Sequence, residues 1–420
     1  MAESARHQTF LSVIGMGADG LDSLSGKARA ALDAADILVS SPRLFALIPD
    51  DGRQRIEWRS PLSATLPDLE ACRPQKIAVI ATGDPLCYGV GTWLLTKFPI
   101  EDMTIFPNVS AFALTCARMG WPQHKTILQT LHGRDHSTIR DVIAPNARLV
   151  VLSENATTPR TICTHLNDLG YGNSKISVLT HLDGRKEKRF DGIAKDGKTL
   201  FDAAFEANPD HDLNTVAVQC IADPHARILS RAPGNPDHLF SKFRKMTKRE
   251  LRSLALAKLA PQPGDIMWDV GAGSASVAVE FLRLASGGAA YTFDIDADAK
   301  SHQRENARQF GLPNLHIAPH AELPLRDDDL DCDRPDAIFM GGGISKDCIE
   351  AALRFLKPGG RFVCNAVTIE SEVDLLSAYR KHGGELSRIS IARAEPLGAV
   401  HGFKPAMTIT QWFWQKEQQA

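Results

Sequence analysis

Two carboxylates and a glycine turn follow one another in the second half of the chain with the spacing of a ligand-binding loop. Residues 266–270 form a short apolar run that contains Asp269 and ends before Gly271 and Gly273. A second apolar run ends at Asp294. Glycines let backbone amides approach a bound ligand, and an acid at the end of the second strand can hold ribose hydroxyls. The pattern predicts a site for a nucleoside cofactor.

The residues around this turn distinguish between two nucleoside cofactors. A dinucleotide fingerprint would place a third glycine where the chain has Ser276, which disfavours an NAD(P)-dependent oxidoreductase. The acid at Asp269, just before the turn, resembles the first motif of class I S-adenosylmethionine-dependent methyltransferases, with Ala275 where a glycine is usual. In that family the loop lies under the methionine part of the cofactor, and the acid matching Asp294 holds the ribose. The resemblance implies that the two acids and two glycines bind S-adenosylmethionine.

The first half of the chain carries a different set of glycine loops. Gly15 and Gly17 follow one apolar run, and the segment ATGDP at 81–85 ends another. With FPNVSAF at 106–112, these segments resemble in order the motifs of the tetrapyrrole methylases, although Asn108 and Ala111 replace a glycine and a serine. The resemblance implies a second S-adenosylmethionine site. Its cofactor-binding residues would be Gly15, Gly17, Gly83, Asp84, Pro85 and Ser110.

Further segments indicate the class of macrocycle and the positions on it that are methylated. LHGRD at 131–135 resembles a segment of the subgroup that methylates precorrins at C5. Residues 246–284, together with MGGGISKD at 340–347, resemble the corrin C15-methylating, decarboxylating enzymes. A chain with both halves resembles the precorrin-6Y C5,C15-methyltransferase (decarboxylating) family of cobalamin biosynthesis. This resemblance implies two S-adenosylmethionine-dependent methyl transfers and the loss of carbon dioxide from the ring C acetate.

A precorrin carries many carboxylates, which arginine and lysine side chains bind well. The candidates for this role are Arg43, Arg134, Lys248, Arg249, Arg252 and Lys346. Methyl transfer from a sulfonium needs alignment more than a protein nucleophile, so we expect no catalytic triad. The residue that removes the proton lost after methylation is unassigned. The candidates, none of them favoured, are His132, Asp84 and Glu322.

Alternating strands and helices must position both sets of residues. In the first half, apolar runs alternate with helical segments, and the family resemblance implies two α/β lobes. In the second half, a regular strand–helix series predicts a Rossmann-like, doubly wound, mostly parallel sheet with its ligand at the carboxyl ends of the strands. An alternating segment at 406–417 could add an edge strand. We expect a first domain at 1–225, a proline-rich linker at 226–244 and a second domain at 245–420.

Composition narrows the range of partners. The 420-residue chain has a formal net charge of −2, which disfavours a nucleic-acid partner. No apolar run approaches the roughly 20 residues that cross a bilayer, and the N-terminus lacks the form of a secretion signal, so we expect no membrane association and a cytoplasmic protein. The eight cysteines form no CxxC pair and the histidines no HExxH motif, so we expect no metal cofactor. The resemblance implies a homo-oligomer.

Several alternatives stay open at this stage. The substrate could be a cobalt-containing precorrin or another tetrapyrrole, because the sequence does not reveal whether the ring holds cobalt. A tetrapyrrole-binding regulatory module would keep the clefts without the sulfonium chemistry. The order of the two methylations and of the decarboxylation is also undetermined.

Overall fold

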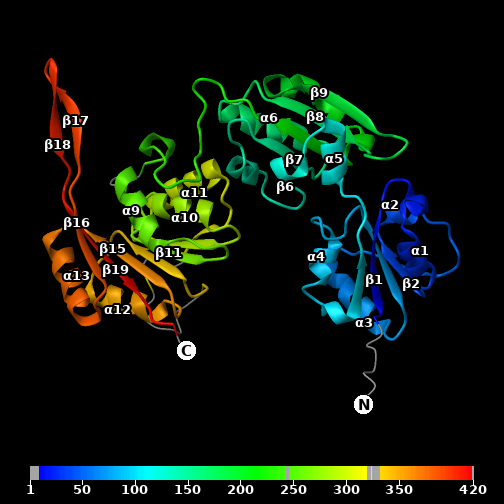
Figure 1. Cartoon of the computed structure of the whole chain (residues 1–420), viewed down its shortest axis with the longest axis horizontal. Coiled ribbons are helices and arrows are strands. Elements are labelled where there is room, and N and C mark those ends of the chain that lie inside the picture. Colours follow the sequence, from blue (N-terminus) through cyan, green and yellow to red (C-terminus); the bar gives the residue numbers. More distant parts are fainter. Residues whose placement is uncertain (1–8, 243–245, 319–322, 324–331, 419–420) are drawn as a thin grey trace, which may run out of the picture. The chain divides into compact units, whose positions relative to one another are not determined.

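The chain folds into two compact units in the computed structural model (Figure 1). The described residues are 9–242, 246–318, 323 and 332–418. Unit 1 comprises Met1–Arg134 and Pro145–Ala226, and unit 2 comprises Asp135–Ala144 and Arg227–Ala420. Among the described residues, no helix combines the length and apolar character needed to cross a bilayer.

The first lobe of unit 1 is built on a five-stranded, wholly parallel sheet in the order β3-β2-β4-β1-β5. Its strands are β1 (Leu11–Met16), β2 (Ile37–Ser40), β3 (Gln54–Glu57), β4 (Ile77–Thr82) and β5 (Met103–Phe106). Its helices are α1 (Gly26–Asp33), α2 (Pro42–Phe45), α3 (Leu66–Ala71) and α4 (Val90–Leu94). Because side chains alternate along a strand, Val13 and Val79 enter one apolar core while Ile14 and Ile80 enter another. Continuous apolar strands are what a parallel sheet buried on both faces requires.

The second lobe of unit 1 contains a mixed five-stranded sheet in the order β6-β7-β10-β8-β9. Its strands are β6 (Ile127–Thr130), β7 (Arg148–Leu152), β8 (Lys175–Thr180), β9 (Lys188–Ile193) and β10 (Asn214–Gln219). The helices are α5 (Ala111–Met119), α6 (Thr158–Asp168), α7 (Gly197–Leu200) and α8 (Ala203–Glu206). Only the β6–β7 pair is parallel. The two α/β lobes confirm the predicted fold of the first half.

Unit 2 is a doubly wound α/β unit, as predicted. Its seven-stranded sheet has the order β13-β12-β11-β14-β15-β19-β16, and the first five strands are parallel. The strands are β11 (Ile266–Val270), β12 (Ala289–Phe293), β13 (Leu315–Ile317), β14 (Ala337–Met340), β15 (Arg361–Ala366), β16 (Glu385–Ile389) and β19 (Ile409–Gln415). The helices are α9 (Arg249–Leu259), α10 (Ser276–Leu284), α11 (Ala299–Phe310), α12 (Lys346–Phe355) and α13 (Ile369–His382). One face is covered by α9, α10 and α11, and the other by α12 and α13 (Figure 1).

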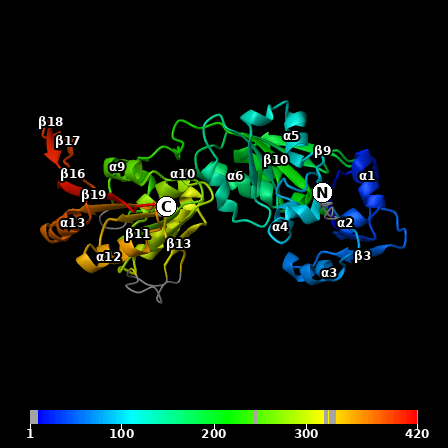
Figure 2. The same cartoon turned by 60° about the horizontal axis from the view of Figure 1, so that its bottom comes forward.

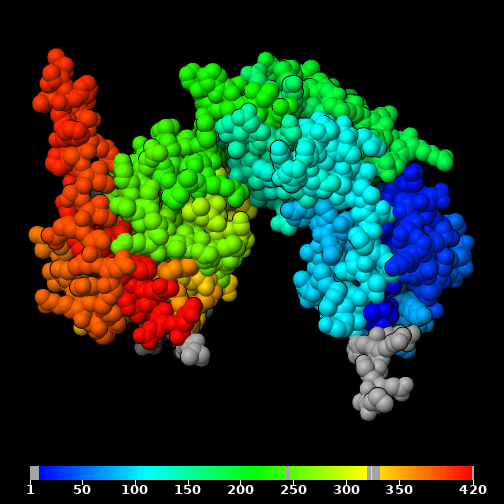
Figure 3. Space-filling view, viewed as in Figure 1, coloured from blue at the N-terminus to red at the C-terminus, as the bar shows by residue number. Residues whose placement is uncertain are grey.

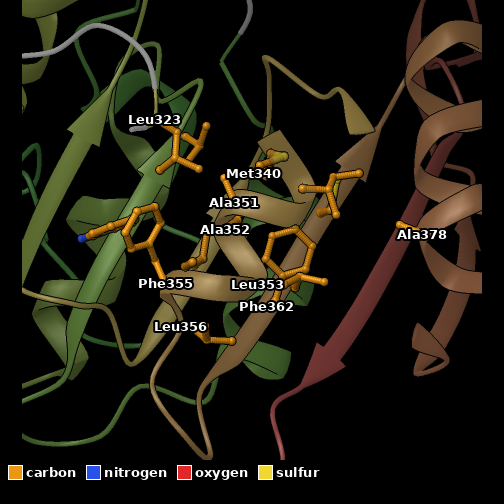
Figure 4. Close-up of a cluster of buried hydrophobic side chains, with 14 of the residues drawn as sticks. Leu323, Met340, Ala351, Ala352, Leu353, Phe355, Leu356, Phe362 and Ala378 are labelled. Atoms are coloured by element: carbon orange, nitrogen blue, oxygen red, sulfur yellow. The ribbon is translucent and has the colours of Figure 1, made fainter. Parts of the chain in front are cut away.

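The core under α12 and α13 shows why these helices form where they do. Ala351, Ala352 and Phe355 from α12 pack toward Met340 and Phe362 of the sheet (Figure 4). The spacing of these α12 residues places them on one side of a helix, which is the side that is buried. The closely packed core fixes the position of the β14 strand end, where the triglycine loop begins.

The last strand departs from the prediction. The alternating C-terminal segment was expected at the edge of the sheet, but β19 lies inside it, antiparallel to both β15 and β16. Trp412 is fully buried and its indole N–H donates to the carbonyl of Gly383 at 2.9 Å. A strand that must bury a tryptophan on one face gains more from a central position than from an edge. The edge strand at this end of the sheet is β16.

A two-stranded arm extends from the far end of this sheet. Within the described part of the chain, the strands β17 (Ala392–Leu397) and β18 (Val400–Pro405) pair only with each other. The arm projects from the rest of unit 2 (Figures 2 and 3). The arm exposes large apolar side chains, and Phe403 is 80% exposed. An isolated hairpin is marginally stable in water. The sequence prediction missed this arm.

The segment that leads from unit 1 into unit 2 is fixed to unit 2 by a buried ion pair. The two carboxylate oxygens of Glu280 accept hydrogen bonds from the backbone N–H groups of Gly234 and Asn235, at 2.7 and 2.8 Å. Arg252 donates to Glu280 at 3.2 Å and to Asp237 at 2.9 Å. Arg252 and Glu280 are both essentially inaccessible to solvent. Part of the predicted linker is therefore ordered structure.

A short segment from within the first half also belongs to unit 2. Asp141 accepts a hydrogen bond from the buried Arg283 at 2.8 Å, and Arg140 donates to the carbonyl of Gln309 at 3.1 Å. At Gly311, which has a φ of +70°, a Cβ atom would lie 2.4 Å from the carbonyl oxygen of Ser137. The backbone at Ser137, two residues after the LHGRD segment, thus lies close to the C-terminal end of α11.

Candidate functional site

The predicted cofactor-binding residues of the first half meet at one edge of the parallel sheet. Because parallel strands end at the same edge, the loops after β1, β4 and β5 lie next to one another. The backbone N–H of Gly83 donates to the carbonyl of Met16 at 2.9 Å. A Cβ atom at Gly15 would lie 2.1 Å from the carbonyl oxygen of Gly83, so this contact requires glycine. The structure thus brings residues 15–17 and residues 83–85 together as a cradle of backbone groups.

Asn108, which departs from the family motif, stabilises this cradle. Its side-chain amide donates to the carbonyls of Gly15 and Ser23, both at 3.1 Å. The Ser23 hydroxyl in turn accepts a hydrogen bond from the backbone N–H of Gly17 at 2.8 Å. Ser110 caps α5 by accepting from Ala113 at 3.1 Å. Sequence reasoning treated Asn108 as a weakness of the motif, whereas it connects two loops.

A pocket opens at this edge, between residues of both lobes of unit 1. From the first lobe it is lined by Met16, Gly17, Ala18, Arg43, Leu44, Thr82 and Gly83. From the segment that leads into α5, and from α5 itself, it is lined by Val109, Ala111 and Leu114. From around strands β8 and β10 of the second lobe it is lined by Leu179, Leu182, Leu213, Asn214 and Thr215. The guanidinium of Arg43 donates to the Thr82 hydroxyl at 2.6 Å. The lining residues around β8 and β10 were not predicted, because no motif marks the end of β8 or the start of β10.

The residues after Gly83 form a partly exposed apolar surface beside the pocket. Asp84 accepts a hydrogen bond from the backbone N–H of Leu86 at 2.9 Å, which shapes the turn. Leu86 and Tyr88 are about half exposed, at 47% and 49%. The guanidinium carbon of Arg134 lies 5.7 Å from the centre of the Tyr88 ring. His132 is exposed in the same LHGRD segment as Arg134.

Pro85 fixes the loop that carries Asp84. It is buried, and the backbone of Gly89 and Gly91 packs on it so tightly that Cβ atoms there would lie 2.6 and 2.8 Å from its carbonyl oxygen. Asp84 itself is partly exposed, and its carboxylate is engaged by the backbone of its own turn. The geometry thus indicates that residues 83–85 shape the cradle.

In unit 2 a second cradle forms from two glycine loops. Gly271 has a φ of +67°, and a Cβ atom there would lie 2.5 Å from the backbone nitrogen and Cα of Gly342. The backbone N–H of Gly341 donates to the carbonyl of Val270 at 2.9 Å. The triglycine segment, which could have been a mere connector, therefore packs against the first glycine turn at the carboxyl edge of the sheet.

Asp294 holds the glycine turn of this second cradle. Its carboxylate accepts from the backbone N–H of Gly273 at 2.7 Å and from that of Asp296 at 2.9 Å. Gln303 and Asn306 of α11 hold the same turn by donating to the carbonyls of Gly273 and Ser274, at 3.1 and 2.8 Å. These two amides were not predicted, because a glutamine and an asparagine inside a helical pattern carry no motif.

Asp269 lies beneath the glycine turn. It is 2% exposed, and its carboxylate accepts a hydrogen bond from the backbone N–H of Ala278 at 3.2 Å, near the start of α10. Burial, with a smaller contribution from the negative charge of Asp294, raises the pKa of Asp269 to about 7. The side chain is inaccessible, so it shapes the turn from below rather than facing a ligand.

The basic candidates of unit 2 have different environments. Arg252 is fully buried and engaged by Glu280 and Asp237, so it secures the connecting segment and does not face a substrate. Lys248 and Arg249 are exposed at the start of α9. Lys346 is exposed at the start of α12, directly after the triglycine loop. Glu322 lies outside the described residues.

Comparison with known proteins agrees with the family resemblance stated for each half of the chain. Residues 11–195 match the family of tetrapyrrole (corrin/porphyrin) methylases, and residues 238–416 match the precorrin methyltransferase domain family. A precorrin-6Y C(5,15)-methyltransferase (decarboxylating) of Sinorhizobium sp is 36% identical over 420 residues, which cover 99% of this chain and 98% of the relative. The chain belongs to the precorrin-6Y C(5,15)-methyltransferase (decarboxylating) family.

A second full-length relative and one solved domain are also similar to this chain. The protein of that name from Mycobacterium tuberculosis (strain CDC 1551 / Oshkosh) is 37% identical over 411 residues, which cover 96% of this chain and 99% of the relative. A solved C-terminal domain of precorrin-6Y C5,15-methyltransferase from Rhodobacter capsulatus is 39% identical and covers 45% of this chain and all of that domain, with a TM-score of 0.41. Family membership makes the chain an S-adenosylmethionine-dependent methyltransferase.

Proposed function

We propose that this chain methylates precorrin-6Y at C5 and at C15 and removes carbon dioxide from its ring C acetate. Unit 1 would carry out the C5 methylation, and unit 2 the C15 methylation and the decarboxylation. The observation that carries this proposal is the presence of two separate glycine cradles, at Gly15 with Gly83 and at Gly271 with Gly342, in one member of this family. Each cradle lies at the carboxyl edge of a parallel sheet, where such folds bind their ligands.

Both cradles suit S-adenosylmethionine, which supplies an electrophilic methyl group when bound. In each cradle a glycine lets one loop pack directly against the backbone of the next, at a contact where a Cβ atom would clash. In unit 1, Gly17, Gly83 and Arg43 line the pocket for it. In unit 2, Asp294 is partly exposed at the end of β12, the position from which a carboxylate can hold ribose hydroxyls.

The described residues contribute alignment to the reaction. A meso carbon of the conjugated ring attacks the methyl group, and the ring then loses a proton from that carbon when its conjugation is restored. In the decarboxylation, the bond between the acetate methylene and its carboxylate breaks, carbon dioxide leaves, and the electron pair passes into the macrocycle. The pair returns when the methylene carbon takes up a proton, which leaves a methyl group on ring C. The protein accelerates methyl transfer largely by holding the ring carbon in line with the methyl group.

The surface beside the unit 1 pocket suits a flat, polyanionic ring. Leu86, Tyr88 and Val109 offer exposed apolar area, and Arg134 lies over Tyr88 at its margin. We place the macrocycle on this surface with acetate or propionate groups on Arg134 and Arg43. In unit 2 the corresponding candidates are Lys248, Arg249 and Lys346, which are exposed. Arg252 is excluded from this role by its buried ion pairs.

A homo-oligomer is part of the proposal. The arm formed by β17 and β18 exposes Leu397, Val400 and Phe403, by 68%, 62% and 80%. Exposed apolar area of this kind favours association with a second copy. Sedimentation velocity of the full chain would test it: the wild-type protein should sediment as an oligomer, and Phe403→Glu should shift it toward the monomer. A monomeric wild-type protein would contradict this part.

The reaction is tested by incubating the full chain with precorrin-6Y and S-adenosylmethionine labelled with carbon-13 in the methyl group. Mass spectrometry should show a product with two labelled methyl groups and one carbon dioxide fewer. Carbon-13 NMR should place the labels at C5 and C15. If only a cobalt-containing ring is turned over, the alternative substrate is correct, and if neither ring is methylated, the proposal fails.

A further inference from the structure

One buried side chain of the unit 1 pocket has an unused hydrogen-bond acceptor. Asn214, the first residue of β10, lines the pocket and is 6% exposed. Its side-chain oxygen Oδ1 has no hydrogen-bond donor among the described residues of the chain. Buried polar atoms in folded proteins are nearly always paired, and an orphan at a ligand pocket indicates a group that the ligand satisfies.

The orientation of this amide is fixed by the hydrogen bonds of its nitrogen. Nδ2 donates to the carbonyl of His211 at 2.8 Å and to the carbonyl of Asn155 at 3.1 Å. Turning the amide over would place its oxygen against two carbonyl oxygens, which is unfavourable because all three are acceptors. Neither His211 nor Asn155 lines the pocket. The nitrogen is therefore the end held by the protein, and the oxygen is the end that remains for a ligand.

The surroundings indicate which donor the oxygen accepts from. Leu179, Leu182 and Leu213 line the same side of the pocket, and their apolar side chains suit a flat aromatic ring. The glycine cradle, which suits the more polar parts of the cofactor, is formed by the first lobe. An adenine ring carries one exocyclic amino group, which is a hydrogen-bond donor.

We propose that Asn214 is the adenine-selecting residue of the unit 1 site, with its Oδ1 accepting a hydrogen bond from the 6-amino group of S-adenosylmethionine. This inference rests on the proposed function, since it requires that the cofactor occupy this pocket. Asn214 is a positioning residue: by holding the adenine it fixes the far end of the cofactor and thereby the place of the transferred methyl group.

The test compares S-adenosylhomocysteine with its analogue in which purine, lacking the 6-amino group, replaces adenine. Both are titrated calorimetrically into the full chain carrying Gly271→Ala, in which the added methyl group clashes with Gly342 and impairs the unit 2 site. With Asn214 intact, the purine analogue should bind roughly tenfold or more weakly, because it leaves the buried oxygen unpaired. With Asn214→Ala, the two ligands should bind within about threefold of each other, although both bind more weakly.

Controls separate this role from a structural one. Asn167→Ala removes an exposed asparagine whose side chain donates a partly buried hydrogen bond to the carbonyl of Ala194 at 3.0 Å and does not line the pocket; it should keep the preference for adenine. If Asn214→Ala does not fold by circular dichroism, Asn214→Ser replaces it, because its hydroxyl can still donate to one of the two carbonyls. A preference for adenine that survives the loss of Asn214, or the absence of any preference in its presence, overturns the inference alone. No binding of either ligand overturns the proposed function of unit 1 as well.

Discussion

The Cα of Gly15 lies so close to the carbonyl oxygen of Gly83 that a Cβ atom at Gly15 would stand 2.1 Å from it. This contact joins the loop after β1 to the loop after β4, and it exists because adjacent parallel strands end at the same edge. The two glycines are 68 residues apart, yet together they determine whether the first cradle can form.

Gly15→Ala should therefore impair the unit 1 site. The added methyl group must push the two loops apart, which would distort the cradle and lower its affinity for S-adenosylhomocysteine at least tenfold, or about 1.4 kcal/mol. Isothermal titration of the full chain should show one strong site where the wild type shows two. Gly26→Ala is the matched control, because nothing lies within 4 Å of a Cβ atom there. Two unchanged sites in Gly15→Ala would refute the assignment of the first cradle.

Gly271→Ala should have the corresponding effect on unit 2. Its Cβ atom would lie 2.5 Å from the backbone of Gly342, and its φ of +67° is unfavourable for alanine. The variant should lose the second strong site and keep the first. Gly264→Ala has a similar backbone conformation, with a φ of +81°, but no atom within 4 Å of its Cβ. This control therefore separates the steric clash from backbone strain: it should retain both sites.

Asp269 should make the stability of the protein depend on pH. Its pKa is raised to about 7 in the folded protein, so between its usual value of 3.8 and 7 the folded state binds more protons than the unfolded state. The contribution of Asp269 to the free energy of unfolding consequently falls as the pH rises through this window. Asp269→Asn keeps an acceptor for Ala278 without a titrating group. Its stability relative to the wild type should increase by about 2–3 kcal/mol between pH 5 and pH 8.

Urea denaturation of both proteins without ligand, at pH 5 and pH 8, measures this difference. Asp296→Asn is a suitable control, because Asp296 is an acid near the same turn that is partly exposed. A difference between Asp269→Asn and the wild type that is the same at both pH values would mean that the buried carboxyl does not titrate in this range.

The ion pair of Arg252 with Glu280 should matter for stability rather than for substrate binding. Replacing Arg252 by methionine leaves a buried carboxylate without its charge partner, which typically costs about 3–5 kcal/mol. Arg252→Met with Glu280→Gln should recover part of this loss, and thermal unfolding would measure both. The exposed Arg249→Met should leave the melting temperature nearly unchanged and raise the KM for the precorrin. A raised KM with unchanged stability in Arg252→Met would restore Arg252 as a substrate ligand.

Much of this architecture could be predicted from the sequence, because it rests on local patterns. Apolar runs followed by glycines predicted the strand ends that carry Gly83 and Gly271, and the spacing to Asp294 predicted its position after the second strand. Residues that act through distant contacts could not be predicted in this way. Asn108, Gln303 and Asn306 stabilise loops from other elements, and their role depends on tertiary packing that no local spacing encodes.

Arg252 is a residue whose local sequence pattern suggested the wrong environment. In the sequence it is one of several basic residues at the start of an amphipathic helix, which is a pattern typical of a solvated or anion-binding face. Its burial depends on Glu280 and Asp237, whose positions relative to it are set only by the fold. The antiparallel strand β19 is similar: its alternation predicted a strand, but its place between β15 and β16 follows from long-range pairing.

The central claim is that each half of this chain delivers one methyl group to the same ring. It is tested most directly by giving precorrin-6Y and methyl-labelled S-adenosylmethionine to Gly15→Ala and Gly271→Ala, and locating the labels by carbon-13 NMR. We predict that Gly15→Ala gives a ring labelled at C15 and decarboxylated but not labelled at C5. We predict that Gly271→Ala gives no label at C15 and retains the acetate carboxylate. The same product pattern from both variants would contradict the claim.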